Sequence, residues 1–434
     1  MQPTDICSCG KPHRSPTKTV VIGANALAAL PATCDAYRHI LVVADRHTQA
    51  ACGDRVVSLL GDRVAAVQVF NDEILIPDET ALSAIEEPIR GRLKKGSCPI
   101  DHIVGVGSGV INDLCKETAH RFDLRYTIVA TAPSMDGYAS AGAALILGGM
   151  KVTLTATPPE AIVADTAVLC GAPMDMIRAG YGDIIGKYSC LNDWKLAALI
   201  RGEYICPAVW QWVKDTADRV RSMAVGIRRR EPEAIEALMR ALVDVGVAMA
   251  YVGNSRPASG SEHHIAHFLE ISGIRRGRPY LAHGVDVACG AVLTARLREE
   301  ILSRAPAPRP FDREAYAATI RDVYAVRGGT HGETHGEMPG DGMEASIVNM
   351  QESIGWYTDR GIERFVLSHT EEIRAVLADA PSAAETRAMV EAVGLSFESF
   401  LAFYGEDTLR EAILWGKDLK DRYTVLWLYH RFYA

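Results

Sequence analysis

Short apolar runs alternate with helix-length amphipathic stretches through the first third of the chain. The apolar runs, rich in Val and Ile, cover residues 19–23, 39–44, 64–70, 101–106 and 126–131. Amphipathic stretches with helical spacing lie between them, at about 48–60, 78–94 and 109–121. Strands that alternate with helices form crossover units, and nearly continuous apolar strands are typical of a sheet covered on both faces. The pattern therefore predicts an α/β domain with a mostly parallel sheet.

The pattern of apolar residues changes near Pro173, and the new pattern continues to the C-terminus. Strand signals become rare, and apolar residues recur with 3.6-residue spacing at 175–199, 232–252, 260–272, 283–303, 312–325, 384–395 and 407–424. We therefore expect two domains, an α/β domain over 1–172 and an all-α domain over 173–434. The polar, Gly-rich segment 327–343 is expected to be an exposed loop.

Composition excludes several classes of protein. The 434 residues carry a net charge of −8, which argues against nucleic acid or an anionic membrane as the main partner. No uncharged apolar run approaches the roughly 18 residues of a membrane span, and the first twenty residues lack the apolar region of a secretory signal. Ten cysteines are too few for a disulfide scaffold, and Cys115, Cys190 and Cys289 lie in predicted helices. We expect a reduced, cytoplasmic protein without a membrane span.

A glycine cluster, Gly105-Val-Gly107-Ser108-Gly109, lies between a predicted strand and a predicted helix. Glycines let a backbone approach a phosphate, and a helix N-terminus offers unpaired N–H donors. The alternative is a tight turn without a ligand. Asp45, at the end of the second apolar run, suits a ribose hydroxyl. The Asp45 side chain equally suits the N-cap of the helix predicted at about 48–60, unless Thr48 caps that helix instead.

The segment after the fifth apolar run is also rich in hydroxyls. Thr131-Ala-Pro-Ser134 is followed by Asp136 and Gly137. Hydroxyls and backbone amides at a strand end suit cofactor contacts, and a proline-directed turn is the alternative.

The helical half holds a cluster of metal-ligand types. Asp183 and Lys187 are four residues apart on one helix face, which fits a surface ion pair unless the apolar flanks bury the helix. His263 and His267 are likewise four apart, and His283 follows twenty residues after His263. Capping or core histidines are the alternative. An Asp with two or three His is a plausible open site for a divalent metal.

Two further groups are weaker. Cys7, Cys9 and His13 resemble half of a zinc knuckle, but no second Cys/His half follows at a suitable spacing, so we favour a turn. His331 and His335 share a polar segment with two glutamates, and we favour a solvated loop there over a second metal.

Five motifs in one order resemble one family. These are the GVGSG turn, TAPSMDGYAS, GYGDIIGKYSCLNDWK, SGSEHHIAHFLE and LAHG. The combination resembles the sn-glycerol-1-phosphate dehydrogenases, within the superfamily of dehydroquinate synthases and iron-dependent alcohol dehydrogenases. The opening CSCGKPH and the closing KDLKDRYTVLWL also resemble that family, so the likeness spans nearly the whole chain. It implies a Rossmann-like N-terminal domain, an all-α C-terminal domain and a dehydroquinate synthase-like fold.

The resemblance also implies site residues. It assigns a divalent metal to Asp183, His263 and His283, and so selects His263 over His264. It places His267 and Asp136 near the substrate. It implies NAD or NADP as the cofactor, bound by Asp45, Gly107, Ser108, Gly109, Thr131, Ser134 and Ser140. The acidic Asp45 favours NAD, because a 2′-phosphate would be repelled.

We therefore expect a metal-dependent oxidoreductase that interconverts dihydroxyacetone phosphate and sn-glycerol 1-phosphate. Zinc is the expected metal, with nickel and ferrous iron as alternatives. Lys187 and Arg256 are our candidates for the cations that meet the substrate phosphate, and Lys187 can also assist catalysis. A homodimer is expected as the common default. The alternatives are a dehydroquinate synthase-like lyase, another polyol or alcohol dehydrogenase, and a nucleotide-binding protein without catalytic activity.

Overall fold

Six parallel strands form the sheet that the alternating pattern predicts. The computed structural model describes residues 7–94, 96–148, 150–325 and 342–434, and the sheet order is β1-β8-β5-β4-β2-β3. Five strands confirm the predicted runs: β1 (Thr19–Gly23), β2 (Ile40–Asp45), β3 (Val64–Phe70), β4 (His102–Gly107) and β5 (Arg125–Ala130). The sixth, β8 (Ala161–Asp165), was not predicted, although it lies between β1 and β5. Its short run AIVAD follows a two-stranded sheet of β6 (Gly142–Leu147) and β7 (Met150–Thr155) that was also missed.

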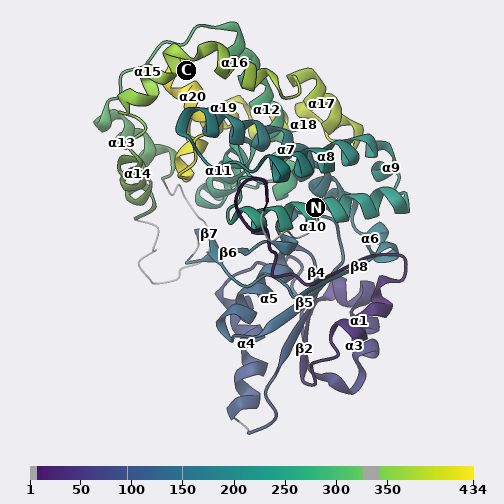
Figure 1. Cartoon of the computed structure of the whole chain (residues 1–434). Coiled ribbons are helices and arrows are strands. Elements are labelled where there is room, and N and C mark those ends of the chain that lie inside the picture. Colours follow the sequence, from purple (N-terminus) through teal and green to yellow (C-terminus); the bar gives the residue numbers. More distant parts are fainter. Residues whose placement is uncertain (1–6, 95, 149, 326–341) are drawn as a thin grey trace. The chain divides into compact units, whose positions relative to one another are not determined.

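Helices cover both faces of this sheet, as Figure 1 shows for α1 and α3 on one side and α4 and α5 on the other. On the first face, Val42, Val104 and Val163 pack with Leu27 and Leu30 in a buried core. Alternate strand residues face the other way, where Ile111 and Cys115 of α5 approach the glycines of β4. The helices are α1 (Leu30–Thr33), α2 (Arg46–Thr48), α3 (Asp54–Leu60), α4 (Glu79–Lys94) and α5 (Gly109–Arg121).

The chain divides into two compact units. The first comprises the described residues of 1–147, 151–181 and 222–253, and the second those of 148–150, 182–221 and 254–434. The division falls inside the helix α7 (Met174–Arg201), near the predicted change at Pro173. The helices α6 (Thr166–Gly171), α9 (Ala224–Arg228) and α10 (Pro232–Val252) belong to the first unit, because α10 packs against α6, α9 and the 3-10 turn η4 (Asp136–Ala139).

The second unit is helical, as expected. The helices at its centre are α7, α11 (Ser261–Arg276) and α12 (His283–Ser303), and α11 packs along α12. The others are α8 (Pro207–Ser222), α13 (Arg313–Val323), α14 (Met343–Ile354), α15 (Arg360–Ser368), α16 (Thr370–Ala378), α17 (Ala383–Ala392), α18 (Phe397–Tyr404), α19 (Glu406–Trp415) and α20 (Val425–Phe432).

One predicted helix differs in extent from the structure, and one predicted loop lies mostly outside the described residues. The helix predicted over 407–424 was wrong in extent, because α19 ends at Trp415 and a 3-10 turn, η6 (Gly416–Leu419), follows it. Lys417 donates to the Leu414 carbonyl and to Asp418, and both side chains are fully buried. The expected loop 327–343, with His331 and His335, lies outside the described residues except for its last two positions.

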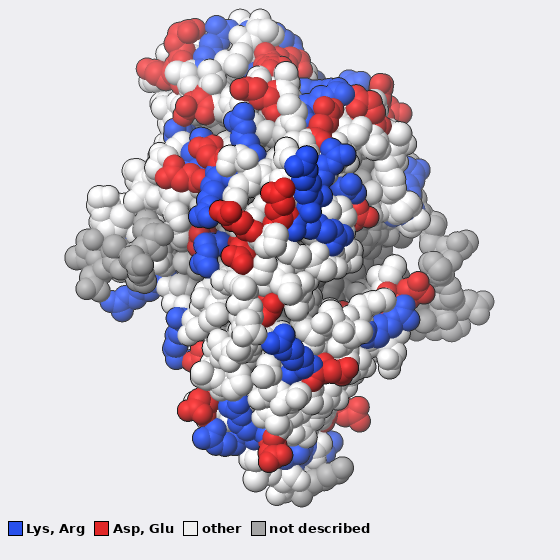
Figure 2. All heavy atoms as spheres, turned by 90° about the vertical axis from the view of Figure 1, so that its right-hand side faces the viewer, with Lys and Arg blue, Asp and Glu red and all other residues white. Residues whose placement is uncertain are grey.

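Surface and cysteine properties agree with the composition. Basic and acidic side chains are intermixed over the face that Figure 2 shows, so neither sign forms a continuous field there. All ten cysteines are described and none is in a disulfide. Cys115, Cys190 and Cys289 lie in helices, as predicted, and are buried there. In the part of the chain that the structure describes, no helix is long and apolar enough to cross a membrane.

Candidate active site

Three side chains far apart in the sequence meet in the second unit. Asp183 of α7, His263 of α11 and His283 of α12 each offer one ligand atom, and these atoms lie within 4.8 Å of one another. His263 Nε2 is 3.5 Å from Asp183 Oδ1, and the two imidazole centroids are 5.2 Å apart. A carboxylate with two imidazoles at this spacing is a donor set suited to a divalent metal.

Glycines allow the three helices to approach closely enough for this. A Cβ on Gly182, beside Asp183, would lie 2.3 Å from the Gly284 carbonyl oxygen, beside His283. A Cβ on Gly290 would lie 2.4 Å from the carbonyl oxygen of Glu262. Both contacts are with backbone atoms and cannot relax by side-chain rotation. The backbone contacts therefore set the distances among the three ligands.

A buried lysine neutralises the carboxylate of this cluster. Lys187 Nζ donates to Asp183 Oδ1 at 2.8 Å and to the Ala258 carbonyl at 2.9 Å, and both charged side chains are fully buried. The ion pair expected from their spacing is present, but it is buried. Because an unpaired buried carboxylate is costly, the ion pair with Lys187 offsets the cost of burying Asp183 and fixes the position of its side chain.

Two glutamates that we did not assign from the sequence orient the two histidines. Glu262 Oε1 lies 2.7 Å from His263 Nδ1, and Glu270 Oε1 lies 2.7 Å from His283 Nδ1. A carboxylate at Nδ1 fixes the tautomer that leaves Nε2 to bind a metal. Burial lowers the pKa of His263 well below its ordinary value. The positions of both glutamates in the SGSEHHIAHFLE motif were the available signal.

The other histidines of the motif lie differently. His264 is fully buried, and neither ring nitrogen has a hydrogen-bond partner among the described residues. Burial lowers the pKa of His264 well below its usual range. The ring of His267 lies 5.5 Å from that of His283 and 6.2 Å from that of His263, between centroids. His263 therefore joins Asp183 and His283, with His267 beside them.

The first turn of α11 is fixed by another buried acid. Asp193, on α7, accepts hydrogen bonds from the Ser261 N–H at 2.6 Å and the Val425 N–H at 2.7 Å. Burial raises the pKa of Asp193, and the two backbone donors oppose that shift. This residue was also missed, because its partners are distant in sequence.

In the first unit, the glycine cluster forms the predicted turn. Gly107 ends β4 and Gly109 begins α5, with Ser108 as an N-cap whose side chain makes no capping hydrogen bond. A Cβ on Gly107 would lie 2.5 Å from Ile111 Cβ, whereas one on Gly109 would meet only Met135 at 3.4 Å. Gly107 is thus required by strand–helix packing, and the N-terminus of α5 presents unpaired N–H groups.

Asp45 lies at the same edge of the sheet. Ala44 pairs with Val106, so the strand ends at Asp45 and Gly107 are neighbours. Asp45 Oδ1 accepts from the His47 N–H at 2.8 Å and the Thr48 N–H at 2.9 Å. The alternative in which Thr48 caps this helix was wrong, because Asp45 itself is the N-cap and Thr48 completes its capping box.

The segment after β5 folds over α5. Thr131 N–H donates to the Gly107 carbonyl at 3.1 Å, and Ser134 N–H donates to the Ala132 carbonyl at the same distance. Asp136 is buried at the start of η4, and Ser140 Oγ donates to the Gly137 carbonyl at 3.0 Å.

Lys116, which we did not single out from the sequence, ties this segment to α5. It is fully buried, and its Nζ donates to the Gly137 and Gly142 carbonyls at 3.0 and 2.7 Å. The loop shape therefore depends on a lysine that the sequence motif does not contain.

The expectation that Arg256 meets a substrate phosphate is not supported by its surroundings. Arg256 is buried, its Nε donates to Glu203 Oε1 at 2.6 Å, and its Nη2 also pairs with Glu203. Nη1 donates to the Tyr423 carbonyl at 3.0 Å. These internal partners occupy the guanidinium.

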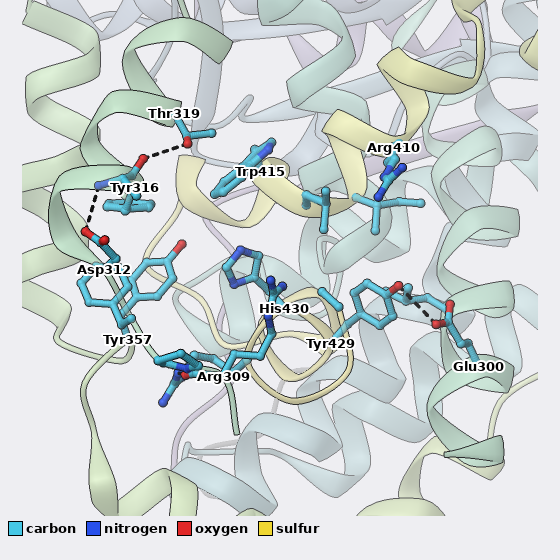
Figure 3. A pocket seen from close by; sticks show the side chains of 18 of the residues that line it. Glu300, Arg309, Asp312, Tyr316, Thr319, Tyr357, Arg410, Trp415, Tyr429 and His430 are labelled. Carbon is cyan, nitrogen blue, oxygen red and sulfur yellow. Dashed lines mark hydrogen bonds between the residues drawn. The ribbon is translucent and has the colours of Figure 1, made fainter. Parts of the chain in front are cut away.

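A separate pocket of about 600 Å³ lies in the second unit (Figure 3). His430 lies between aromatic rings, 5.2 Å from Trp415 and 5.7 Å from Tyr357 between centroids. Tyr429 donates to Glu300 at its rim. None of the predicted site residues lines this pocket.

Known proteins are similar to this chain along most of its length. The chain is 34% identical to a glycerol-1-phosphate dehydrogenase [NAD(P)+] of Bacillus licheniformis over 322 residues, 73% of this chain and 78% of the relative. It is 36% identical to one of Methanosphaerula palustris over 256 residues, 58% of this chain and 68% of the relative. Residues 21–173 match the family model of the iron-containing alcohol dehydrogenases.

Solved structures show the same fold at low identity. The glycerol dehydrogenase of Schizosaccharomyces pombe matches with a TM-score of 0.53 at 17% identity, covering 91% of this chain and 93% of that one. An alcohol dehydrogenase from Oenococcus oeni matches with a TM-score of 0.56 at 12% identity, covering 94% and 95%. From the identity to its relatives, the chain belongs to the glycerol-1-phosphate dehydrogenase family, among the iron-containing alcohol dehydrogenases.

Proposed function

We propose that this protein is a metal-dependent NAD(P) oxidoreductase that interconverts dihydroxyacetone phosphate and sn-glycerol 1-phosphate. The observation that carries the proposal is the buried donor set of Asp183, His263 and His283 in a chain related to dehydrogenases of this name. A glutamate lies at Nδ1 of each histidine, and Lys187 donates to the aspartate. These partners orient the three side chains in the way that is usual for metal ligands.

The residues of the second unit fit a divalent ion, which supplies Lewis acidity to the reacting carbonyl or hydroxyl. Asp183, His263 and His283 hold it, and zinc, nickel and ferrous iron all suit these donors. Lys187 fixes the carboxylate, and Glu262 and Glu270 fix the rings. His267, whose ring lies next to that of His283, is the candidate to hold or move a proton at the substrate oxygen.

The first unit supplies the cofactor site of this proposal. The N-terminus of α5, with Gly107, Ser108 and Gly109, receives the pyrophosphate of NAD(P). Asp45, at the neighbouring strand end, meets the adenosine ribose and favours NAD. Thr131, Ser134 and Ser140, on the loop that Lys116 anchors, are further proposed contacts of the cofactor, and Asp136 of that loop is the proposed group near the substrate.

The substrate phosphate requires a cation, and we propose Lys420 as a candidate. Lys187 and Arg256 are both buried in internal ion pairs. Lys420 follows η6 in the unit that holds the metal ligands, and it belongs to the closing segment KDLKDRYTVLWL of the family resemblance. Lys420→Met should therefore raise KM for dihydroxyacetone phosphate and leave KM for dihydroxyacetone unchanged.

One assay tests the proposal. The metal-loaded protein is given NADH or NADPH with dihydroxyacetone phosphate, dihydroxyacetone or glycolaldehyde. We expect nucleotide oxidation with the phosphorylated ketone, and a product that an sn-glycerol-3-phosphate-specific dehydrogenase cannot oxidise. A preference for dihydroxyacetone would instead indicate a polyol dehydrogenase, which the glycerol dehydrogenase fold neighbour makes the second candidate.

Two other outcomes would overturn the proposal. Phosphate release from a phosphorylated sugar acid without net cofactor change would identify a lyase. Nucleotide binding without any turnover would identify a binding protein. We also propose a reducing, cytoplasmic location, which fits the lack of any disulfide among the ten described cysteines, and a homodimer, which light scattering can test.

A further inference from the structure

The segment Cys7–His13 at the start of the described chain places three metal-ligand side chains together. Cys7, Cys9 and His13 each offer one ligand atom, and these atoms lie within 4.8 Å of one another. Cys9 Sγ lies 3.5 Å from His13 Nε2. A tetrahedral zinc ion with its usual bond lengths holds a sulfur and a nitrogen about 3.6 Å apart, and two sulfurs about 3.8 Å apart. The segment therefore has the spacing of a zinc-binding loop.

The imidazole of His13 is oriented as a metal ligand. His13 Nδ1 is 3.0 Å from the carbonyl oxygen of Tyr251, and the two rings stack at 5.4 Å. A carbonyl oxygen only accepts hydrogen bonds, so Nδ1 carries the proton and Nε2 keeps a lone pair. Nε2 is the nitrogen beside Cys9 Sγ. An imidazole that donates from one nitrogen to a backbone carbonyl and presents the other to a metal is the usual arrangement.

A tight turn brings the two thiols together. Gly10 N–H donates to the Cys7 carbonyl at 2.8 Å, Cys7 N–H donates to the Lys11 carbonyl at 3.0 Å, and Gly10 has a φ of +84°. The turn expected from the sequence is thus present. It also builds a ligand set, because His13 is fully buried beside it while the two cysteines are half-buried.

We propose that Cys7, Cys9 and His13 bind a second metal ion, with zinc as the natural occupant. Two thiolates and one imidazole favour zinc over magnesium or calcium. Each thiol releases its proton when the ion binds, and a fourth ligand completes the tetrahedron. The ion would fasten the start of the chain to the end of α10, where Tyr251 lies.

Cobalt(II) is the probe, because thiolate ligands give it a charge-transfer absorption that oxygen and nitrogen ligands do not. The donor set of Asp183, His263 and His283 contains no sulfur, so this band reports only the proposed site. The full-length protein is stripped of metal, loaded with cobalt(II) and titrated with zinc. The band should appear in the unmodified protein and disappear as zinc displaces cobalt.

Variants assign the band to its ligands. It should be lost in Cys9→Ser and His13→Asn and should remain in His263→Ala, which removes the other centre. Cys98→Ser, at an exposed cysteine, is the matched control and should keep the band. Metal analysis should find two bound ions per unmodified chain and one in either Cys9→Ser or His263→Ala.

Absence of the band in the unmodified protein, or its persistence in Cys9→Ser, would overturn the proposal. X-ray absorption of the zinc-loaded His263→Ala variant gives an answer that does not depend on the folding of the cysteine variants. Two or three sulfur ligands would support the site, and none or one would refute it. Because these measurements need no turnover, they stand or fall independently of the proposed dehydrogenase activity.

Discussion

Two fully buried lysines, one in each unit, stabilise the two candidate sites in different ways. Lys116 donates mainly to backbone carbonyls, those of Gly137 and Gly142, and its acidic neighbour Asp113 is partly exposed. Lys187 donates to a carboxylate, Asp183, that is as buried as the lysine itself. Lys116 therefore holds the cofactor loop through its backbone carbonyls, whereas Lys187 holds the metal-ligand cluster through the side chain of Asp183. The two sides should respond differently to single substitutions.

The largest expected effect is on the metal side. His283→Ala and His263→Ala each remove one of three proposed protein ligands, so bound metal and activity should be lost together. Activity should fall by roughly 10³-fold or more, because the ion contributes several kcal/mol to the transition state. Metal content and kcat/KM are measured on the same preparations. His264→Ala is the control, and full metal occupancy in His263→Ala with loss in His264→Ala would reverse the assignment.

The second effect compares the lysines directly. Lys187→Met leaves the Asp183 carboxylate buried without its cation, so the metal-free protein should lose about 3–5 kcal/mol of unfolding free energy. Adding zinc should recover much of that loss, because the metal replaces the lysine as the partner of Asp183. Lys116→Met should cost less, about 1–3 kcal/mol from its unpaired carbonyls, and zinc should not restore it. Urea unfolding with and without zinc distinguishes the two. If zinc restored the unfolding free energy equally in both variants, the proposed difference between the two lysines would be wrong.

The third effect is a pH dependence of the unfolding free energy that comes from one histidine of the main sheet. His102, in β4, is buried against Tyr37, hydrogen-bonded to Thr127 at 2.9 Å, and burial lowers its pKa to about 4. The unfolded chain binds this proton below about pH 6.5, so the stability that His102 contributes is complete above that pH and is lost as the pH falls toward 4. Between pH 7.5 and 5 the loss should be about 2 kcal/mol.

The comparison that checks it is with His102→Gln, which keeps a hydrogen-bonding group but does not titrate. Chemical unfolding of both proteins at several pH values should show that the difference between their unfolding free energies becomes smaller as the pH falls. A constant difference would mean that His102 does not titrate in this range.

The smallest effect concerns the glycine turn. Gly109→Ala places its Cβ in ordinary contact with Met135, so stability should stay within about 0.5 kcal/mol while NADH affinity falls roughly tenfold. Gly107→Ala would force Ile111 to move and should cost about 1–3 kcal/mol of stability. Calorimetry of NADH binding and thermal unfolding separate the effects. Unchanged NADH binding in Gly109→Ala would show that the turn is structural only.

The sequence predicted what depends on local pattern. Five of the six strands of the main sheet were recognised from continuous apolar runs, and α11 and α12 from their helical spacing. The proposed ligands His263 and His283 were selected through the family resemblance, because their spacing alone left capping or core histidines open. The strand β8 was missed because five residues after a hairpin offer little periodicity.

The partners of these residues could not be predicted in the same way. Lys116 and Asp193 bind backbone groups that are distant in the sequence, and Arg256 pairs with Glu203 of a distant loop. Buried polar groups find their partners only when the chain is packed, so their pairing is a tertiary property. The same holds for His13, whose tautomer depends on a carbonyl in α10.

The glycine contacts between α7, α11 and α12 have a consequence for how the centre takes up its ion. Gly182 lies one residue before Asp183, and its contact is with Gly284, one residue after His283. The packing of the helices thus fixes the spacing of the proposed ligands before a metal ion binds. Exchange among divalent ions then requires only side-chain rotation, so the centre should be emptied and refilled without passing through an unfolded state. Ions that need longer distances to their ligands should bind more weakly, because the backbone contacts keep the helices from moving apart.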